Sequence, residues 1–291
     1  MKIELDNIYN IDCLEGMKDI PDGSVDAVIC DLPYGVLYKD NPHAQWDNII
    51  PFEPLWEQYE RVTKDNAAIV LFAQGMFTAQ LMMSNPKLWR YNLIWDKQRV
   101  TGFLNARRMP MRCHEDICVF YKTLPVYNPQ MEKCAPHQRN HSRGKQDGEQ
   151  TNRCYGVFGK AEDNITDEKY PRSIVTTYGR DYEGRTYESV PRVESTVPEG
   201  YKLPTSIIGI KKEHESTVLH PTQKPVDLIR YLIRTYTNEG GVVLDNCMGS
   251  GTTAVACVKE KRHFIGFELN EKYHRIACER VKREQQQLTL F

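Results

Sequence analysis

Three observations in the sequence predict an α/β fold with a largely parallel sheet. Short apolar runs at 25–30, 66–73 and 242–244 are typical of strands that are buried on both faces. Segments with helical spacing of apolar residues alternate with such runs along the chain. The last run leads through a glycine-containing turn into a helix and then another strand, which is a βαβ unit.

The elements follow in order from these patterns. In the N-terminal part we expect strands at 3–5, 8–10, 25–30, 66–73, 91–95 and 117–120, and helices at 13–20, 54–65 and 77–83. In the C-terminal part we expect a helix over 221–237 with proline near its start, strands at 242–244 and 263–267, and helices at 254–259 and 271–287.

The composition is that of a folded globular chain rather than a disordered or collagen-like one. The 291 residues are 40% hydrophobic and 26% charged, with a formal net charge of -1. No run of about 18 apolar residues occurs, and the N-terminus lacks the basic start and apolar core of a secretory signal, so we expect a cytoplasmic protein. The nine cysteines include no Cys-x-x-Cys pair, which favours reduced thiols and no metal site over a zinc site at Cys113, His114 and Cys118.

Charge and order are distributed unevenly along the chain. Residues 86–145 contain 12 basic and four acidic residues, which indicates a polyanionic partner unless the segment is simply a solvated surface. From 122 to 219, turn formers and charges replace apolar periodicity. This stretch is typical of a loop-rich insertion that recognises a substrate, with a partly ordered linker as the alternative.

A glycine-containing turn follows the strand at 242–244. Gly249 and Gly251 allow the backbone to approach a ligand that a Cβ atom would repel, and the next helix directs free N–H groups toward it. Glu268 ends the following strand, where an acid can hydrogen-bond the hydroxyls of a ribose. The unit therefore indicates a ligand that contains a nucleoside.

A second motif, Asp31-Leu32-Pro33-Tyr34, ends a buried strand. A carboxylate and the backbone carbonyl beside Pro33 can each accept an N–H from an exocyclic amine, which frees the nitrogen lone pair, while Tyr34 stacks on the ring. The alternative is a simple turn with a solvent-facing Asp31.

Taken together with other short motifs, these two motifs make the sequence resemble the β-class S-adenosylmethionine-dependent DNA amino-methyltransferases. The matching segments are 31–34, 93–97, 114–117, 220–225 (His-Pro-Thr-Gln-Lys-Pro) and 245–253. The resemblance implies a Rossmann-like methyltransferase fold with a seven-stranded mixed sheet and a circularly permuted motif order. It also implies a catalytic half at 1–121, a target-recognition insertion at 122–219 and a cofactor-binding half at 220–291.

The resemblance also implies roles for individual residues. S-adenosylmethionine would be the cofactor, and double-stranded DNA the partner, with the target base flipped out of the duplex. The catalytic residues would be Asp31, Pro33 and Tyr34. Cofactor contacts would come from Asp12 (adenine), Glu268 (ribose), Lys224, Asp245, Cys247, Gly249 and Gly251. DNA phosphates would be contacted by Lys97, Arg99, Arg107, Arg108 and Arg112.

We expect methyl transfer to N6 of adenine, because cytosine enzymes of this family more often have Ser in place of Asp31. N4 of cytosine is the nearest alternative. Methylation of glutamine or RNA, a catalytically silent DNA-binding protein and a nicotinamide dehydrogenase are further alternatives. A second copy of the chain and a restriction endonuclease both remain open as additional partners.

Overall fold

A computed structural model describes residues 2–36, 47–101, 106–130 and 223–288, together with short strands between 132 and 176. Side chains are described within these ranges except at 98–101 and 288, and not in the short strands. The chain divides into two compact units, one of residues 1–128 and 173–291 and one of residues 129–172.

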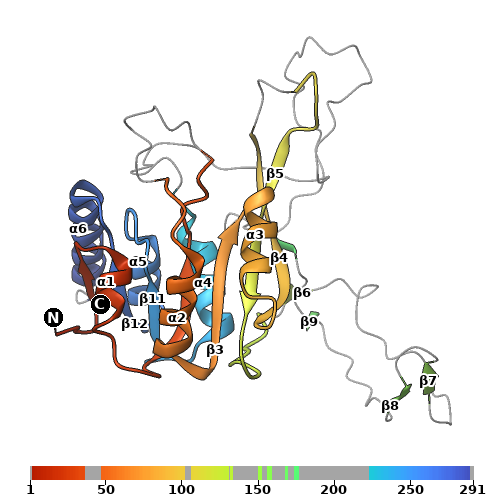
Figure 1. Ribbon diagram of the computed structural model, residues 1–291, viewed down its shortest axis with the longest axis horizontal. Helices are drawn as coiled ribbons and strands as arrows, with labels where there is room; N and C mark the ends of the chain where they lie inside the picture. The colour runs from red at the N-terminus through yellow and green to blue at the C-terminus, as the bar shows by residue number, and fades with distance from the viewer. Residues whose placement is uncertain are drawn as a thin grey trace. The chain divides into compact units, whose positions relative to one another are not determined.

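The larger unit contains a mixed sheet (Figure 1). Its strand order is β1-β12-β11-β2-β3-β5-β4-β10. All pairs from β1 to β3 are parallel, β5 is antiparallel to both β3 and β4, and β10 is parallel to β4. The bounds are β1 Asn7–Tyr9, β2 Val25–Cys30, β3 Thr63–Ala73, β4 Trp89–Thr101, β5 Arg112–Phe120, β10 Ile174–Thr176, β11 Val242–Asp245 and β12 His263–Phe267.

This sheet confirms the predicted α/β class and the mixed sheet. Seven of its strands lie outside the predicted insertion, and β10, which lies inside 122–219, adds an eighth at the edge beside β4.

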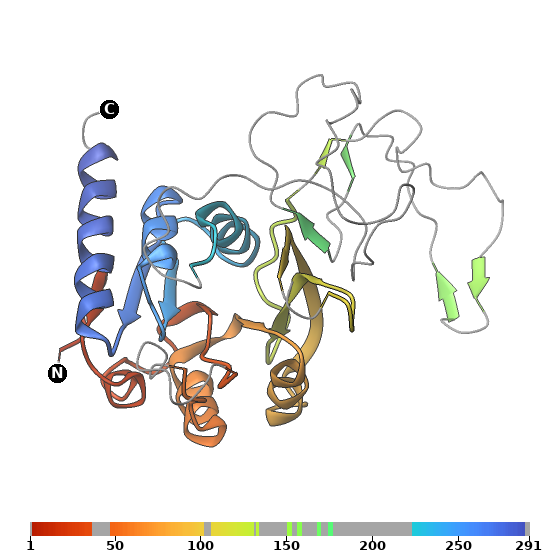
Figure 2. The ribbon, with the colours of Figure 1, turned by 90° about the horizontal axis from the view of Figure 1, so that it is seen from above.

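Helices cover both faces of the sheet (Figure 2). One face carries α1 (Cys13–Met17), α2 (Phe52–Val62) and α3 (Met76–Ser84), and the other carries α4 (Val226–Tyr236), α5 (Thr252–Lys259) and α6 (Glu271–Leu288). Each helical layer packs its own buried cluster against the sheet. The strands between the two layers are therefore buried on both faces, as their apolar runs predict.

The helices form where apolar spacing and end signals coincide. Pro225 precedes α4, and Leu228, Ile229, Leu232 and Ile233 are all buried on the same face. Burial of each such side chain stabilises the fold by roughly 1.5–3 kcal/mol. Asp12 caps α1 by accepting a hydrogen bond from the Leu14 amide at 2.9 Å.

The register of β2 and β11 decides where the two motifs lie. Val243 pairs with Ala27 and Leu244 with Val28, in parallel. The chain therefore leaves these neighbouring strands at the same edge of the sheet, just before Asp31 and just after Asp245. The carboxyl ends of parallel strands are where open α/β sheets bind their ligands.

The smaller unit contains two antiparallel ladders among its described residues. In one, β6 (Glu132–Lys133) pairs with β9 (Glu168–Lys169), and in the other β7 (Gln150–Asn152) pairs with β8 (Gly156–Phe158). Most of the predicted insertion at 122–219 lies outside the described residues.

Several predicted bounds differ from the structure. The helix expected at 54–65 ends at Val62, and residues 63–65 already belong to β3. Residues 3–5 do not form a strand. The Glu4 backbone N–H group instead donates a hydrogen bond to the Tyr9 hydroxyl at 2.6 Å. The strands β4 and β5 extend beyond their apolar runs because they pair with one another through polar positions, including Asp96 with His114. No helix in the described ranges combines the length and apolarity needed to cross a membrane.

Candidate active site

Asp31 follows β2 directly and is held from two sides. The Tyr34 hydroxyl donates a hydrogen bond to its Oδ1 atom at 2.8 Å, and the Lys224 ammonium donates to Oδ2 at 2.5 Å. The Asp31 side chain is 25% exposed and that of Lys224 is 8% exposed. The carboxylate therefore lies at the sheet edge with a partner on each oxygen.

Burial and neighbouring charges act in opposite directions on these groups. Burial raises the pKa of Asp31, and Lys224 opposes this increase only in part. Burial also raises the pKa of the Tyr34 phenol well above its ordinary value, with further increases from Asp31 and Glu115. Tyr34 is therefore a neutral hydroxyl donor at physiological pH.

The Tyr34 ring is supported by a second aromatic ring. Its centroid lies 5.0 Å from that of Phe77 at an interplanar angle of 27°, which is a stacked arrangement. Phe77 belongs to α3 and is itself buried. One face of Tyr34 is thus fixed by the fold.

The glycine turn after β11 has the backbone that its residues predict. Gly249 has φ +55° and Gly251 has φ +84°, both in the left-handed region that favours glycine. Gly251 is the N-cap of α5, and a Cβ atom there would lie 2.9 Å from Ala277 in α6. The turn therefore brings α5 and α6 close together at the same edge as Asp31.

Glu268 borders this turn, and further acidic residues follow the neighbouring strands. The Gly249 amide donates to Oε2 of Glu268 at 2.7 Å, and the Asn270 amide donates to Oε1 at 2.8 Å. Asp12 follows the neighbouring strand β1 and is exposed, with its Oδ1 atom capping α1. Asp12, Asp31, Asp245 and Glu268 thus all lie at the carboxyl ends of adjacent parallel strands.

The carboxylates at this edge repel one another. Burial raises the pKa of Asp245 to about 6, and the charge of Asp31 adds to the increase. Burial also raises the pKa of Glu268, again with a contribution from Asp245. A cationic ligand would relieve this repulsion, so the set of acidic groups fits a ligand that carries positive charge.

A buried polar network surrounds Asn246 and Cys247, the residues that lead into the glycine turn. Asn246 accepts a hydrogen bond from the Tyr59 hydroxyl at 2.5 Å, and its amide nitrogen lies 3.6 Å from the sulfur atoms of both Cys13 and Cys247. The Cys247 amide donates to Asp245 at 3.0 Å. Tyr59 was not predicted as part of the site, because its spacing in α2 is that of an ordinary core residue.

The two lysines among the predicted site residues both form ion pairs with Glu115. Lys97, expected on a phosphate-binding surface, is only 13% exposed and its ammonium bonds Glu115 at 3.1 Å. Lys224, expected at the cofactor, contacts Asp31 and Glu115. Its neighbour Gln223 is the residue that reaches the glycine turn, accepting from the Ser250 hydroxyl at 2.9 Å. Residues 220–222 of the same motif lie outside the described residues.

The other basic residues expected at DNA phosphates lie in or just before β5, apart from Arg99 in β4. Arg107 and Arg108 are exposed between β4 and β5, and Arg112 is exposed at the start of β5. Arg112 also bonds Gln74 at 3.3 Å, whereas the side chain of Arg99 lies outside the described residues.

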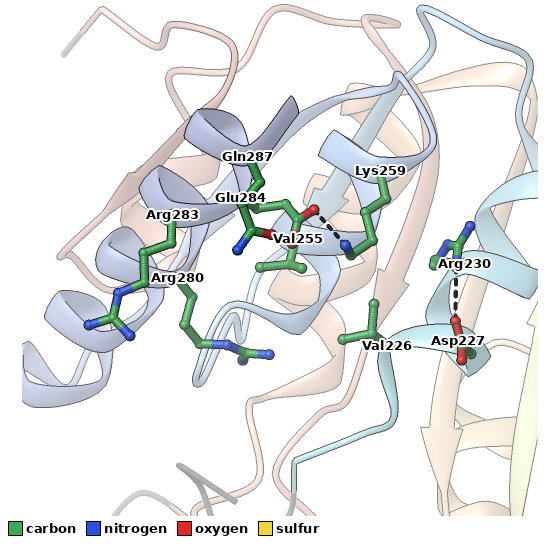
Figure 3. Close-up of a pocket in the computed structure, with 9 residues that line it drawn as sticks. All are labelled: Val226, Asp227, Arg230, Val255, Lys259, Arg280, Arg283, Glu284 and Gln287. Atoms are coloured by element: carbon green, nitrogen blue, oxygen red, sulfur yellow. Dashed lines mark hydrogen bonds and ion pairs between the residues drawn. The ribbon is translucent and has the colours of Figure 1, made fainter. Parts of the chain in front are cut away.

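A separate cavity of about 320 Å³ lies between α4, α5 and α6 (Figure 3). Its cations are largely neutralised, since Lys259 pairs with Glu284 at 2.5 Å and Arg230 with Asp227 at 2.9 Å. None of the predicted site residues lines it, so this cavity is separate from the sheet edge at Asp31 and the glycine turn.

Comparison with known proteins identifies the family to which this arrangement belongs. The family model for DNA methylases matches residues 25–279, from β2 through the first half of α6. The chain belongs to the DNA methylase family. These DNA methylases are amino-methyltransferases, which use S-adenosylmethionine as methyl donor and modify N6 of adenine or N4 of cytosine.

Individual relatives of this DNA methylase agree in fold and length. The Type II methyltransferase M1.MboII of Moraxella bovis is 24% identical over 281 residues, which cover 93% of this chain and 94% of the relative. The solved M1.HpyAVI–SAM complex is 21% identical, with a TM-score of 0.53 over 94% of this chain and 98% of that one. The cytosine-N4-specific PvuII DNA methyltransferase is 13% identical, with a TM-score of 0.60 over 99% and 93%.

Proposed function

We propose that this DNA methylase transfers a methyl group from S-adenosylmethionine to N6 of adenine in a specific sequence of double-stranded DNA. The observation that carries the proposal is the carboxylate of Asp31, which ends β2 and is followed by Pro33 and Tyr34. Cytosine enzymes of the resembling family more often begin this motif with Ser, so Asp31 favours adenine over cytosine.

The residues of the motif suit activation of an amine. Asp31 and the backbone carbonyl beside Pro33 each accept one N–H, which reduces delocalisation of the nitrogen lone pair into the ring. S-adenosylmethionine, when bound, supplies the electrophilic methyl group. The nitrogen forms a bond to the methyl carbon while the bond from that carbon to the sulfonium sulfur breaks, which would leave a neutral thioether. The methylated nitrogen then releases its proton to solvent. Acceptors fixed in advance in this way contribute up to about 3–4 kcal/mol each to transition-state stabilisation.

Tyr34 would hold the target ring in place. Its ring already rests on Phe77 and can stack on a base with its other face. The hydroxyl that now donates to Asp31 can give way at Oδ1 when the amine arrives. Because a paired and stacked amine is out of reach, the base must first leave the duplex.

The cofactor would bind at the acidic strand ends. The sulfonium and amino cations of S-adenosylmethionine match the region around Asp245 and Glu268, where burial raises the pKa values of both groups. Glu268 would accept from the ribose hydroxyls and Asp12 would contact the adenine. Cys247 and the turn from Gly249 to Gly251 would border the methionine end.

DNA would be held by phosphate contacts and read by the insertion. Arg107, Arg108 and Arg112 are exposed on one segment, which supports contacts with the phosphate backbone. The segment 122–219 is rich in Arg, Asn and Gln, the side chains that read base edges.

The identity of the methylated base tests this proposal directly. The purified protein is incubated with S-adenosylmethionine and mixed-sequence duplex DNA, and the digested nucleosides are analysed by mass spectrometry. N6-methyl-2′-deoxyadenosine is the expected product. N4-methylcytosine would reject the choice of base but retain the family chemistry.

A variant tests the role assigned to Asp31. Asp31→Ala is expected to lower kcat by about 100-fold or more while DNA affinity changes little, because the group acts on the amine and not on phosphate. The matched control is Asp22→Ala, in an exposed surface pair with Arg61, and it should retain activity. Methyl transfer by Asp31→Ala at the normal rate would remove Asp31 from the mechanism.

A further inference from the structure

Four charged side chains from separate parts of the chain meet beside the catalytic motif. Asp31 contacts Lys224 at 2.5 Å, and Lys224 Nζ lies 3.2 Å from Glu115 Oε2. Glu115 Oε1 in turn accepts from Lys97 at 3.1 Å. Asp31 follows β2, Lys224 lies just before α4, Glu115 belongs to β5 and Lys97 to β4. Their charges alternate, so the group as a whole is neutral.

Strand pairing and burial hold the residues of this group together. Strand β5 runs antiparallel to its neighbours, so its N-terminal half lies at the edge where the parallel strands end. Glu115 pairs with Trp95 across the ladder, two residues before Lys97. Lys224 is 8% exposed and its ammonium also lies 5.1 Å from the Phe72 ring centroid, a cation–π distance.

The protonation states agree with the geometry. Burial works against the charged form of Lys224, but Asp31 and Glu115 outweigh it and raise the lysine pKa. Burial likewise favours protonation of Glu115, but Lys224 and Lys97 outweigh it and lower the carboxyl pKa. Lys224 is therefore a cation and Glu115 an anion at neutral pH.

The two oxygens of Asp31 have partners of different kinds. Oδ1 accepts from the neutral Tyr34 hydroxyl, which an amine N–H can replace one for one. Oδ2 accepts from a buried ammonium, whose removal would leave an uncompensated charge on both sides. A substrate amine would therefore displace Tyr34 from Oδ1 more readily than Lys224 from Oδ2.

We propose that Lys224 is a positioning residue for the reaction: it fixes Asp31 through Oδ2 and leaves Oδ1 to the target amine, while Glu115 and Lys97 balance the lysine charge. The proposal rests on the proposed function of Asp31 as the amine acceptor. It differs from the contact with the cofactor that the sequence resemblance suggests for Lys224.

The proposal predicts a pH dependence with a definite sign. Within the described ranges, the groups that act electrostatically on Asp31 are Lys224, Glu115, Tyr34, Cys30 and Asp245, with Lys97 acting through Glu115. Loss of a cation favours the protonated carboxyl, whereas loss of an anion favours the carboxylate. Neutralising Lys224 and neutralising Glu115 should therefore shift Asp31 in opposite directions.

The first variant is Lys224→Met, assayed for kcat from pH 5 to 9 with Lys64→Met as the matched control. Lys64 forms a 2.7 Å pair with Asp26 away from the motif, so its variant should keep the normal profile. Lys224→Met should move the acid limb of kcat upward by about 1–3 pH units. Its Kd for S-adenosylmethionine, measured by calorimetry, should stay within about twofold of the normal value. Lys224→Arg, which keeps the positive charge, should restore part of the kcat that Lys224→Met loses.

Glu115→Gln is the second variant and keeps the proposal testable if Lys224→Met does not fold. Its acid limb should move to lower pH, because the like charge that opposes ionisation of Asp31 is gone. A merely structural role for Glu115 or Lys224 would not give opposite shifts.

The results separate the inference from the proposed function. An unchanged acid limb in Lys224→Met, together with a tenfold or greater loss of S-adenosylmethionine affinity, would show a cofactor contact and overturn the inference. Acid limbs that shift the same way in both variants would also overturn it. Failure of the unmodified protein to methylate any DNA amine would instead reject the proposed function.

Discussion

At the scale of single residues, the site combines groups whose ordinary charge the fold opposes. Asp245 is 4% exposed, and burial raises its pKa to about 6. Its partners are the Cys247 amide and neighbouring side chains rather than a cation. Such a carboxylate destabilises the free protein when it is ionised, and a bound cation compensates for it.

Replacement of this carboxyl by an amide should separate stability from binding. Between about pH 4 and 6 the folded protein holds a proton on Asp245 that the unfolded chain, with a pKa near 3.8, has lost, so this residue's contribution to stability falls as pH rises. Asp245→Asn should therefore raise the free energy of unfolding at pH 8 by about 1–3 kcal/mol, with little change near pH 4.

Denaturant unfolding at both pH values measures this effect, and calorimetry should show weaker S-adenosylmethionine binding by the same variant. A variant less stable than the parent at pH 8 would contradict the assignment of Asp245 as a destabilising charge.

At the scale of elements, the turn between β11 and α5 depends on close packing as well as on backbone conformation. Gly251 has φ +84°, and an added Cβ would meet the backbone and side chain of Ala277 at 2.9 Å. Gly23 has a similar φ of +59°, but an added Cβ would meet nothing within 4 Å. The pair separates conformational strain from steric overlap.

We expect Gly251→Ala to lower the free energy of unfolding by about 2–4 kcal/mol, from overpacking together with positive φ. Gly23→Ala should lose only about 1–2 kcal/mol, from φ alone. Thermal or denaturant unfolding of both variants checks the difference. Equal losses would mean that α6 moves freely away from the turn.

Strand β5 shows why part of the site escaped prediction. Its apolar half at 117–120 was predicted as a strand, but residues 112–116 are polar and gave no strand pattern. They are extended because they pair with β4, which is a long-range effect. Glu115 lies in this half, so its meeting with Lys224 follows from strand order and not from local sequence.

By contrast, the sequence placed Asp31 and the turn at Gly249 and Gly251 each after a buried strand, and the pairing of β2 with β11 makes them neighbours. Both come directly after short apolar runs, and neighbouring parallel strands bring the residues at their carboxyl ends to one edge of the sheet. The direction in which a long side chain reaches is less accessible to such reasoning. Lys97 and Lys224 are examples, because the same residue type serves on a phosphate-binding surface or in a buried pair.

At the scale of the whole molecule, the exposed arginines between β4 and β5 make the affinity for DNA testable through salt. Each phosphate contact that is lost should reduce the slope of log affinity against log salt by about 0.9. The double variant Arg107→Ala/Arg108→Ala should therefore reduce the slope by about 1.8, measured by fluorescence anisotropy at several salt concentrations.

The matched control removes two other exposed arginines. Arg275→Ala/Arg283→Ala, on α6, removes side chains that are 69% and 74% exposed and paired with acidic neighbours on the same helix. Its salt slope should equal that of the unmodified protein. Equal slopes for all three proteins would show that Arg107 and Arg108 do not contact phosphate.

The division of the chain into two units also has an evolutionary consequence. The chain leaves the sheet-containing unit after Asn128, whose side chain bonds the end of α4, and re-enters it before β10. Residues 129–172 are thus a single insertion into the larger unit, which contains both buried clusters. Closing a longer loop costs little extra free energy, so this insertion can diversify in length and composition at little cost to the larger unit.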